Sequence, residues 1–362
     1  MAMRGEVDET AVKRLNGFKI DGEPILCVKF GKGHINNTFL VVDDTARMYI
    51  LQRINSNVFR NPLGVMQNIV AITTYLSSLD RRKRNMLELT PSHSGELWHI
   101  DGEGDYWRLY SFISDSICYQ RAESEDMFRE SGAAFGAFQR SLTDFPAESL
   151  TETIPGFHDT PKRYITFHDA INADSVERVK NVQREIEFVL EREERAGTLM
   201  KRYVEGVLPR RVTHNDTKLN NVLFDRRSKR SICVIDLDTV MPGFSVTDFG
   251  DSIRFGASTA DEDEKDLSKV SFSIKLFRAY AEGYLSACGE YLTDGEIDSL
   301  CDGAHIITLE CGMRFLTDYI SGDTYYRIDY PDHNLDRCRT QFKLVADMES
   351  KWDAMRKIVE ES

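Results

Sequence analysis

The sequence contains no long apolar segment and no closely spaced cysteines. No stretch comes near the roughly 18 consecutive apolar residues of a membrane-spanning helix, and residues 1–18 lack the apolar core that marks a signal peptide. The seven cysteines form no C-x-x-C pair, and the two closest are ten residues apart, which argues against a zinc site or a disulfide framework. We therefore expect a cytoplasmic protein whose cysteines are reduced, most of them buried as small apolar side chains.

Positive charge is also scarce. The 46 Lys and Arg residues are outnumbered by 59 Asp and Glu residues, which leaves a net charge of −13. A strongly negative chain is poorly suited to nucleic acid or to an anionic membrane surface, so we expect neither as a partner. The length of 362 residues, with 41% hydrophobic and 29% charged residues, is typical of a globular protein with two domains or one large bilobal domain.

The segment 212–251 carries polar residues in the order that phosphoryl transfer requires. Its first part contains H-x-D-x4-N, formed by His214, Asp216 and Asn221, and the Asp–Asn spacing equals that of the protein-kinase catalytic loop. In such a loop a carboxylate orients the attacking hydroxyl and accepts its proton, and an amide oxygen five residues later reaches Mg²⁺. We predict that Asp216 is the catalytic carboxylate, that Asn221 binds the metal, and that His214 anchors the loop by hydrogen bonding.

Two further acids stand at the end of the next apolar run, Ile232–Leu237. Asp236 and Asp238 lie where a carboxylate would hold the metal that bridges the nucleotide phosphates. We predict Asp236 as a metal ligand, with Asp238 assisting, and Lys218 as the cation that neutralises the transferring phosphoryl group. The cofactors predicted by this set are ATP and Mg²⁺.

The same acids fit a different class of enzyme. Asp236 opens the pattern D-x-D-x-[TV], which is typical of haloacid-dehalogenase phosphatases, where the first Asp is a phosphorylated nucleophile. Those enzymes carry the pattern near the start of the chain, whereas here it lies two-thirds of the way along. A phosphohydrolase built on Asp236 and a nucleotide-binding protein without catalysis remain the alternatives to a kinase.

Residues 25–54 alternate as three antiparallel strands, and the first turn between them is rich in Gly and Asn. Gly31 and Gly33 in this turn allow backbone amides to approach phosphates closely, so we predict that they bind the nucleotide. Strands at 97–100 and 106–113 would complete a five-stranded sheet.

The third strand, 49–54, lacks the lysine that protein kinases place there, and the predicted helix 62–79 contains no Asp or Glu. The Lys–Glu pair that protein kinases use to hold the phosphates therefore cannot form. The candidates for this role are Gln52 and Arg53, on opposite faces of the strand. Either Gln52 pairs with Gln67 of the helix, or Arg53 meets the phosphates alone.

Beyond residue 113 the pattern is mainly helical. We predict an α+β fold of two lobes, with an antiparallel sheet and one helix in residues 1–113 and a helical lobe, holding the catalytic loop and the acceptor site, in residues 114–362. The predicted helices of this second lobe are 123–142, 174–200, 267–292, 296–320 and 335–359. The last one carries a heptad-like apolar stripe that suits either a dimer seam or packing on its own lobe, and we expect packing and a monomer.

The blocks HNDTKLNNVLF, VIDLDTVMPG and DFGDSIRFG resemble the catalytic core of the aminoglycoside phosphotransferase and choline kinase family, whose members have a protein-kinase-like bilobal fold. The flanking blocks YILQRIN and ECGMRFLTDYISGDTYY resemble the N-acetylhexosamine 1-kinases of that family, and the resemblance spans residues 30–326. It implies a sugar acceptor, GlcNAc or GalNAc, phosphorylated on its anomeric hydroxyl. It also implies that His34, Arg314 and Tyr325 contact the sugar while Asp216 faces the reacting hydroxyl.

Several assignments stay open at this stage. Other acceptors within the family are aminoglycosides, choline, homoserine and methylthioribose. Arg314 has a structural interpretation, an ion pair with Asp318, and Tyr325 has one as a core residue. The resemblance implies that Asp248 holds the backbone of the catalytic loop, while Arg254 is either a phosphate contact or part of a structural ion pair.

Overall fold

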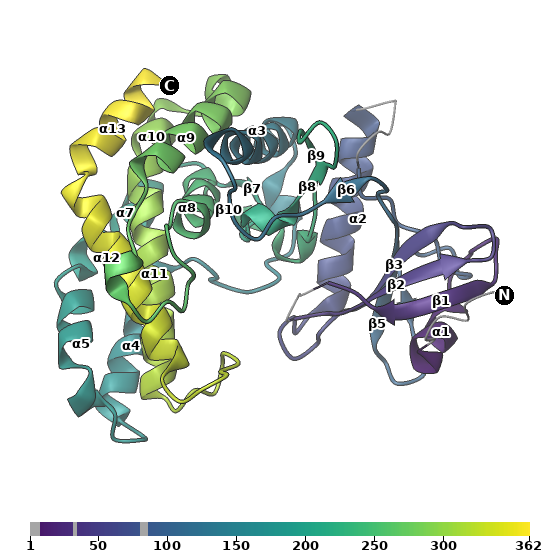
Figure 1. Cartoon of the computed structure of the whole chain (residues 1–362), viewed down its shortest axis with the longest axis horizontal. Coiled ribbons are helices and arrows are strands. Elements are labelled where there is room, and N and C mark those ends of the chain that lie inside the picture. The colour runs from purple at the N-terminus through teal and green to yellow at the C-terminus, as the bar shows by residue number, and fades with distance from the viewer. Residues whose placement is uncertain (1–7, 32–34, 80–85) are drawn as a thin grey trace.

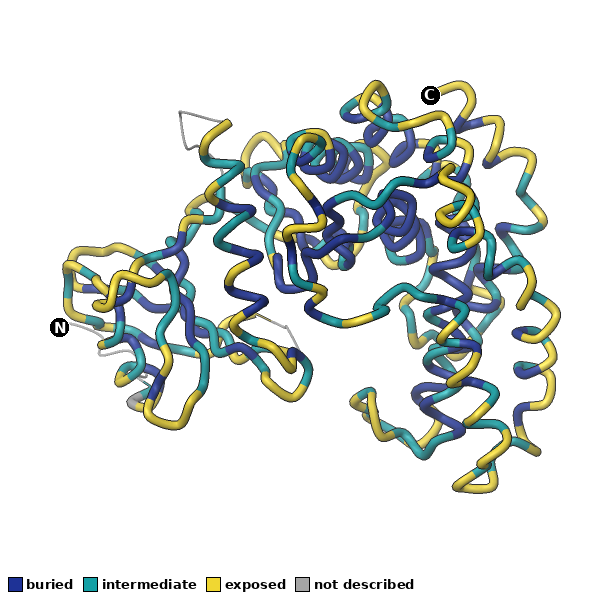
Figure 2. Tube along the Cα trace, turned by 180° about the vertical axis from the view of Figure 1, so that it is seen from behind, coloured by how far each residue is buried: buried dark blue, intermediate teal, exposed yellow. Residues whose placement is uncertain are grey.

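In the computed structural model, which describes residues 8–31, 35–79 and 86–362, the chain forms a small lobe with a sheet and a larger helical lobe (Figure 1). No helix among these residues is long and apolar enough to cross a membrane. Figure 2 shows that buried residues gather inside the helical lobe and along the helix that joins the two lobes.

The small lobe, here called the N-lobe, is built on a five-stranded antiparallel sheet in the order β1-β2-β3-β5-β4. Its strands are β1 (Pro24–Lys29), β2 (Asn37–Asp43), β3 (Met48–Arg53), β4 (His99–Ile100) and β5 (Tyr106–Ser111). The strand register places Thr38 opposite Gln52, and Gln52 opposite Arg108. The predicted five-stranded sheet is confirmed. The prediction of one helix in this lobe is wrong, because a second helix, α1 (Glu9–Leu15), packs its apolar side chains on one face of the sheet.

The helix α2 (Pro62–Leu79) lies between the sheet and the helical lobe, here called the C-lobe (Figure 1). Its buried side chains share one hydrophobic cluster with Leu237 and Val240 of the C-lobe. Asn68 of α2 donates from its side-chain amide to the carbonyl oxygens of Thr151 at 2.7 Å and Val240 at 2.9 Å. The two lobes therefore share part of their core through α2.

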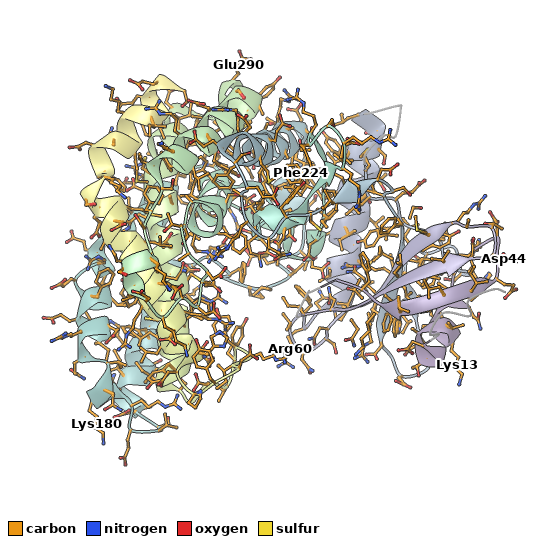
Figure 3. The ribbon with its side chains drawn as sticks, viewed as in Figure 1. Lys13, Asp44, Arg60, Lys180, Phe224 and Glu290 are labelled. Atoms are coloured by element: carbon orange, nitrogen blue, oxygen red, sulfur yellow. The ribbon has the colours of Figure 1, made fainter. Side chains whose placement is uncertain are left out.

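The C-lobe packs its helices around α11, and Phe224 lies within this lobe (Figure 3). Its helices are α3 (Glu125–Ser141), α4 (Thr160–Ala173), α5 (Gln183–Leu190), α6 (Glu193–Ala196), α7 (Thr198–Val204), α8 (Ser245–Gly256), α9 (Ile274–Cys288), α10 (Asp294–Asp298), α11 (Leu300–Ile320), α12 (His333–Ser350) and α13 (Trp352–Glu361). Its strands are β6 (Ser116–Ile117), β8 (Val222–Asp225) and β9 (Ser231–Val234) in one sheet, and β7 (Arg211–Thr213) with β10 (Met241–Gly243) in another.

Several predicted helices are shorter than their apolar patterns suggest. The predicted helix 174–200 is wrong as a single element. Asp174, with φ of 37°, is the C-cap of a preceding helix, α4, that the sequence did not reveal, and Glu177 also has a positive φ, of 57°. The rest of the segment is divided into α5, α6 and the start of α7. The predicted helix 267–292 is helical in its central part, α9, which begins after the N-cap Ser273. The predicted helix 296–320 starts with the expected capping box at Thr293 but breaks before α11.

The predicted terminal helix is divided into α12 and α13 at Lys351. Its apolar stripe is buried in two hydrophobic clusters of the C-lobe rather than exposed. The stripe consists of Leu335, Cys338, Phe342, Val345, Met348, Trp352, Met355 and Val359. Trp352 is half-buried against its cluster, and the other members are buried. Packing on its own lobe is therefore confirmed for this stripe. All seven cysteines are free, as predicted.

Candidate active site

The loop that carries H-x-D-x4-N connects β7 to β8 and closes with the short helical turn η3 (Leu219–Asn221). Asn215 adopts a left-handed conformation, with φ of 62°, which asparagine tolerates better than most residues. Its side-chain amide donates to the carbonyl oxygen of Thr239 at 2.9 Å. Asn215 stands where protein kinases have arginine. Its hydrogen bond to Thr239 connects the loop to the segment that carries Asp236 and Asp238.

Asp216, Lys218 and Asn221 meet at one point of this loop. The Lys218 Nζ atom lies 2.9 Å from Asp216 Oδ1, and Asn221 Nδ2 donates to Asp216 Oδ2 at 2.9 Å. Although burial disfavours a charged carboxylate, Lys218 and the Asn221 amide hold the pKa of Asp216 below its usual range. In turn Asp216 raises the pKa of Lys218. The carboxylate is therefore ionised at neutral pH and can accept a hydrogen bond from a hydroxyl.

His214 is buried beneath the loop. Its Nε2 atom lies 2.9 Å from the carbonyl oxygen of Ile235, and its Nδ1 atom accepts the backbone N–H of Asp216 at 3.3 Å. These two contacts require a neutral ring with the proton on Nε2. Burial lowers the pKa of His214 in the same sense. The predicted anchoring contacts of His214 are thus present.

Two carboxylates of α8 hold the backbone of the loop. Asp248 accepts the N–H groups of His214 and Asn215, each at 2.7 Å, as the family resemblance implied. Asp251 accepts the N–H of Thr217 at 3.0 Å. Burial raises the pKa of Asp248 to about 7, against the opposing effect of its two N–H donors.

Of the two roles left open for Arg254, a phosphate contact or a structural ion pair, the structure shows the ion pair. Its guanidinium lies 2.9 Å from Asp251 Oδ1 and 2.8 Å from Glu262 Oε1. The side chain is buried, so this ion pair stabilises the carboxylate that holds Thr217.

The acids at the end of β9 lie on the turn η4 (Leu237–Thr239), and they differ sharply in environment. Asp236, in a left-handed conformation with φ of 64°, is exposed, and its carboxylate has no hydrogen bond to the described residues. The surrounding protein and the charges of Asp238 and Asp216 raise the pKa of Asp236 to about 7. Asp238 is only 3% exposed, and both of its oxygens contact side chains of the N-lobe, Arg108 and Asn36. The carboxylate predicted to assist the metal thus contacts two side chains of the N-lobe.

The N-lobe candidates have definite partners of their own. Gln52 accepts from Arg108 Nε and donates to Thr38 Oγ1, both at 3.0 Å, whereas Gln67 is exposed on α2. The predicted pair of Gln52 with Gln67 is therefore wrong, because the strand register brings Arg108 to Gln52 instead.

Arg53, on the other face of β3, lies 2.9 Å from Asp105. Gly31 has φ of 80°, a conformation that suits glycine, and apart from its chain neighbours no atom of the described residues lies within 4 Å of a Cβ atom placed there. Gly33 and His34 lie outside the described residues.

Arg108 and Asn36 are site residues that the sequence did not bring forward. One signal for Arg108 was present, since it interrupts the apolar run YWRLYS on the face of β5 that also carries Tyr110. A charge at such a position requires a buried partner. Asn36 gave no comparable signal.

A third group of residues surrounds Arg314 on α11. The guanidinium carbon lies 5.4 Å from the ring centre of Phe157, 5.9 Å from that of Tyr325 and 5.7 Å from that of Tyr326. Arg314 has no ion pair within the part of the chain that the structure describes. The neighbouring Arg163 is a second cation, and burial together with the charge of Arg314 lowers its pKa.

Both structural interpretations of this region are wrong. Asp318 does not pair with Arg314, because its oxygens accept the N–H groups of Thr324, Tyr325 and Tyr326 at 2.8–2.9 Å. Tyr325 is 65% exposed and is therefore not a core residue.

The Arg314 group lies close to the catalytic loop. Cys311, one helical turn before Arg314, is near enough to both Arg254 and Arg314 for their charges to act on its thiol, whose pKa burial raises to about 11. Arg254 in turn holds Asp251, the carboxylate that binds Thr217. A cavity of about 230 Å³ beside the loop is lined by Asn215 and also by Phe157 of the Arg314 group.

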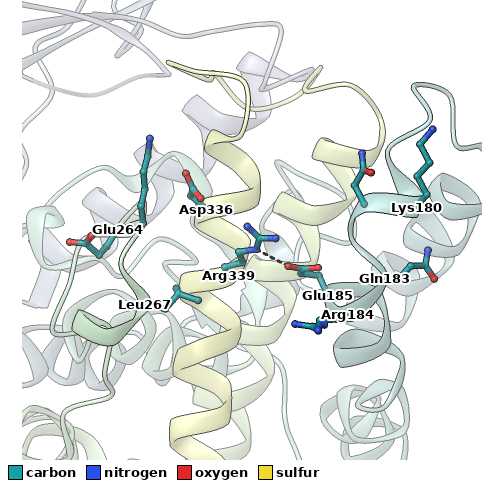
Figure 4. A pocket seen from close by; sticks show the side chains of 10 residues that line it. Lys180, Gln183, Arg184, Glu185, Glu264, Leu267, Asp336 and Arg339 are labelled. Atoms are coloured by element: carbon teal, nitrogen blue, oxygen red, sulfur yellow. Dashed lines mark hydrogen bonds and ion pairs between the residues drawn. The ribbon is translucent and has the colours of Figure 1, made fainter.

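A surface groove of about 540 Å³ lies elsewhere, between α5, α12 and residues 264–267. Acidic and basic side chains are interspersed along it, and Arg339 forms an ion pair with Glu185 there (Figure 4). None of the predicted site residues lines it.

Comparison with known proteins agrees with this arrangement. Residues 27–289 match the model of the family described as phosphotransferase enzyme family. The chain is similar to a microcompartment-associated aminopropanol kinase at 15% identity, with a TM-score of 0.61 and 96% of this chain and 98% of that chain covered.

Two further solved structures extend the likeness. One is an amicoumacin kinase in complex with AMP-PNP and Ca²⁺, at 14% identity with a TM-score of 0.58, covering 98% of this chain and 93% of that chain. The other is a choline kinase from Cryptosporidium parvum, at 14% identity with a TM-score of 0.57, covering 93% and 92%. Likeness at such identities establishes the fold, and the predicted two-lobed, kinase-like α+β fold is confirmed.

Proposed function

From the premise that the chain belongs to the phosphotransferase enzyme family, we propose that it transfers the γ-phosphoryl group of ATP to the anomeric hydroxyl of an N-acetylhexosamine. The family match covers the catalytic loop, so it sets aside the phosphohydrolase that the D-x-D pattern allowed. The reaction and the acceptor are argued separately below.

The side chains at the loop suit Mg²⁺. Asn221 uses its N–H groups on Asp216, which leaves its amide oxygen available, and Asp236 offers an exposed carboxylate. Oxygen atoms of this kind are the ligands that Mg²⁺ prefers. When held by Asn221 and Asp236, Mg²⁺ would neutralise the negative charge of the nucleotide phosphates.

Asp216 is the group that acts on the acceptor. Its ionised carboxylate receives a hydrogen bond from the attacking hydroxyl. It takes the proton as the hydroxyl oxygen bonds to the γ-phosphorus of ATP and the bond from that phosphorus to the β,γ-bridging oxygen breaks, which releases ADP. Lys218, 2.9 Å from Asp216, lies where its charge can compensate the transferring phosphoryl group. His214, Asp248 and Asp251 hold the backbone on which this carboxylate stands.

Arg314 is the observation that supports a neutral acceptor. The guanidinium groups of Arg314 and Arg163 outnumber Glu310, the carboxylate whose charge acts on both, so this group of residues disfavours the positively charged choline and aminoglycosides. A guanidinium donates well to an acetamido carbonyl or a sugar hydroxyl, and the exposed ring of Tyr325 suits the apolar face of a pyranose. An N-acetylhexosamine offers oxygen acceptors to Arg314 and an apolar ring face to Tyr325.

The test is phosphorus NMR of the purified protein with Mg-ATP and a panel of GlcNAc, GalNAc, glucose, methylthioribose, choline and kanamycin. We expect a new anomeric sugar phosphate with an N-acetylhexosamine. The rate of phosphoryl transfer should be about 10²–10⁴-fold lower for Asp216→Asn. Turnover with choline or kanamycin instead would contradict the proposed N-acetylhexosamine acceptor but would support the proposed phosphoryl transfer from ATP. No transfer to any acceptor would overturn both.

A further inference from the structure

Asp238 is a buried carboxylate with a defined pair of partners. It stands two residues after Asp236, on η4, and its side chain is 4% exposed. Oδ1 forms an ion pair with Arg108 Nη1, and Oδ2 accepts a hydrogen bond from Asn36 Nδ2 at 2.5 Å. Both partners belong to the N-lobe, so this acid of the C-lobe is bound from the opposite lobe.

Arg108 is itself held in one orientation. Its side chain is 1% exposed, its Nε atom donates to Gln52 Oε1 at 3.0 Å, and Gln52 Nε2 donates to Thr38 Oγ1 at 3.0 Å. The chain of contacts therefore runs from β2 through β3 and β5 to Asp238. A buried charge pair of this kind is strongly dependent on both partners, because removing one leaves the other charge without compensation.

Asn36 extends the same network to the first turn of the sheet. Its Oδ1 atom accepts the backbone N–H of Asn55 at 3.0 Å, and Asn55 Nδ2 donates to the carbonyl oxygen of Ile35 at 3.0 Å. Ile35 and Asn36 directly follow residues 31–34, which contain the two glycines predicted from the sequence to bind the nucleotide. The contacts of Asp238 thus lead to two separate parts of the N-lobe.

The turn that carries Asp236 is fixed by these contacts. Leu237 and Val240 pack in the cluster of α2, and Asn68 binds the Val240 carbonyl oxygen at 2.9 Å. Asp236 itself is in the left-handed region, a conformation that an aspartate keeps only when its surroundings hold it. Asp238, two residues after Asp236 on the same turn, is held by an ion pair with Arg108.

We propose that Arg108 and Asp238 form a positioning pair that holds the turn of Asp236 against the N-lobe sheet, and that binding of Mg-nucleotide depends on this pair. Asp238 then acts through Arg108 and is not a metal ligand. The proposal rests on the proposed function only in assigning Asp236 to the metal.

The experiment compares Arg108→Lys, Asp238→Asn and the double variant Arg108→Met/Asp238→Leu, which removes both charges together. Arg14→Gln is the matched control, because Arg14 pairs with Asp101 inside the N-lobe without reaching the C-lobe. Calorimetry measures the dissociation constant of AMP-PNP with and without Mg²⁺. Hydrogen exchange measures the backbone amides of residues 237–240 in the free protein.

We expect each of the three variants to weaken Mg-AMP-PNP binding by about 10- to 100-fold, the usual effect of losing a residue that orients a metal ligand. The amides at 237–240 should exchange faster, and the double variant should be no weaker in binding than the worse single variant. Arg14→Gln should change neither quantity. If Arg108→Lys does not fold, Asp238→Asn and the double variant decide the matter.

Opposite results would identify a different role. A loss of Mg²⁺-dependent binding in Asp238→Asn, with wild-type binding and exchange in Arg108→Lys, would make Asp238 a metal ligand and overturn the proposal. Lower thermal stability with unchanged binding and unchanged exchange at 237–240 would make the pair merely structural and also overturn it. If phosphorus NMR finds no sugar phosphate while Mg-AMP-PNP binding and exchange change as expected, the acceptor assignment fails and the positioning pair stands.

Discussion

Arg314 is the residue on which the choice of acceptor depends. It is held on α11 among the rings of Phe157, Tyr325 and Tyr326, with its charge uncompensated by an ion pair in the described residues. A hydrogen bond to a charged group contributes about 1.5–3 kcal/mol, which corresponds to roughly 10- to 100-fold in binding. Substitution of this one side chain should therefore separate acceptor binding from nucleotide binding.

We expect Arg314→Met to raise the KM for an N-acetylhexosamine by about 10- to 100-fold while the KM for ATP stays within about twofold. Steady-state kinetics with each substrate varied in turn provides the measurement. Arg184→Met, in the exposed groove of Figure 4, is the control for loss of an arginine away from the site. Equal effects of Arg314→Met on both substrates would place Arg314 in the scaffold instead.

Individual residues also show what the sequence could and could not predict. Asp216, Lys218 and Asn221 lie together because they share one short loop, so their spacing in the chain was sufficient. The pair of Arg108 and Asp238 joins positions 130 residues apart, and its geometry depends on strand register and on how the lobes meet. No local pattern contains that information.

Among the elements, α8 has the greatest influence on the catalytic loop, since it carries Asp248 and Asp251. It packs against α11 at a contact of two glycines without side chains. A Cβ atom at Gly303 would lie 2.1 Å from the carbonyl oxygen of Val246, and one at Gly250 would lie 2.4 Å from the carbonyl oxygen of Gly303. The backbones of α8 and α11 therefore touch directly.

We expect Gly303→Ala to lower the free energy of unfolding by about 1–3 kcal/mol, because it forces the two helices apart. It should also reduce kcat, since α8 moves together with Asp248. Urea denaturation and steady-state kinetics are the measurements. The matched control is Gly289→Ala at the end of α9, where an added Cβ atom would meet only Leu285 at an ordinary 3.7 Å. Wild-type stability and activity of Gly303→Ala would show that the close contact is not required.

At this scale, local signals predicted elements better than long apolar patterns did. Pro62 at the start of α2 and the capping box at Thr293 are both present as predicted. The long helices 174–200 and 335–359 are divided because apolar spacing continues across a break when the separate pieces bury the same face. Apolar spacing alone does not show where backbone hydrogen bonding stops.

At the scale of the whole molecule, half-buried charged side chains join segments that are distant in sequence. Glu349 on α12 accepts two hydrogen bonds from Arg192, each at 2.8 Å, and lies 2.8 Å from His305 Nε2 on α11. Although burial opposes it, His305 and Arg192 lower the pKa of Glu349 to about 2.

The lowered pKa of Glu349 predicts that its contribution to the free energy of unfolding is lost in acid. The folded pKa lies below the unfolded value of 4.5, so the stabilisation is complete above pH 4.5 and is lost as pH falls toward 2. We expect the difference in free energy of unfolding between wild type and Glu349→Gln to shrink by about 2 kcal/mol between pH 6 and pH 3. Urea denaturation at several pH values measures it. A difference that stays constant with pH would contradict the assignment.

The shared core around α2 bears on the predicted division into residues 1–113 and 114–362. Leu237 and Val240 complete the hydrophobic cluster of α2, and Asn68 closes it with hydrogen bonds to the other lobe. A single cut in the connection between β5 and β6 would therefore leave two fragments that remain associated under native conditions. Each fragment made alone would expose half of that cluster and aggregate, whereas the two mixed together would reconstitute one particle on a sizing column.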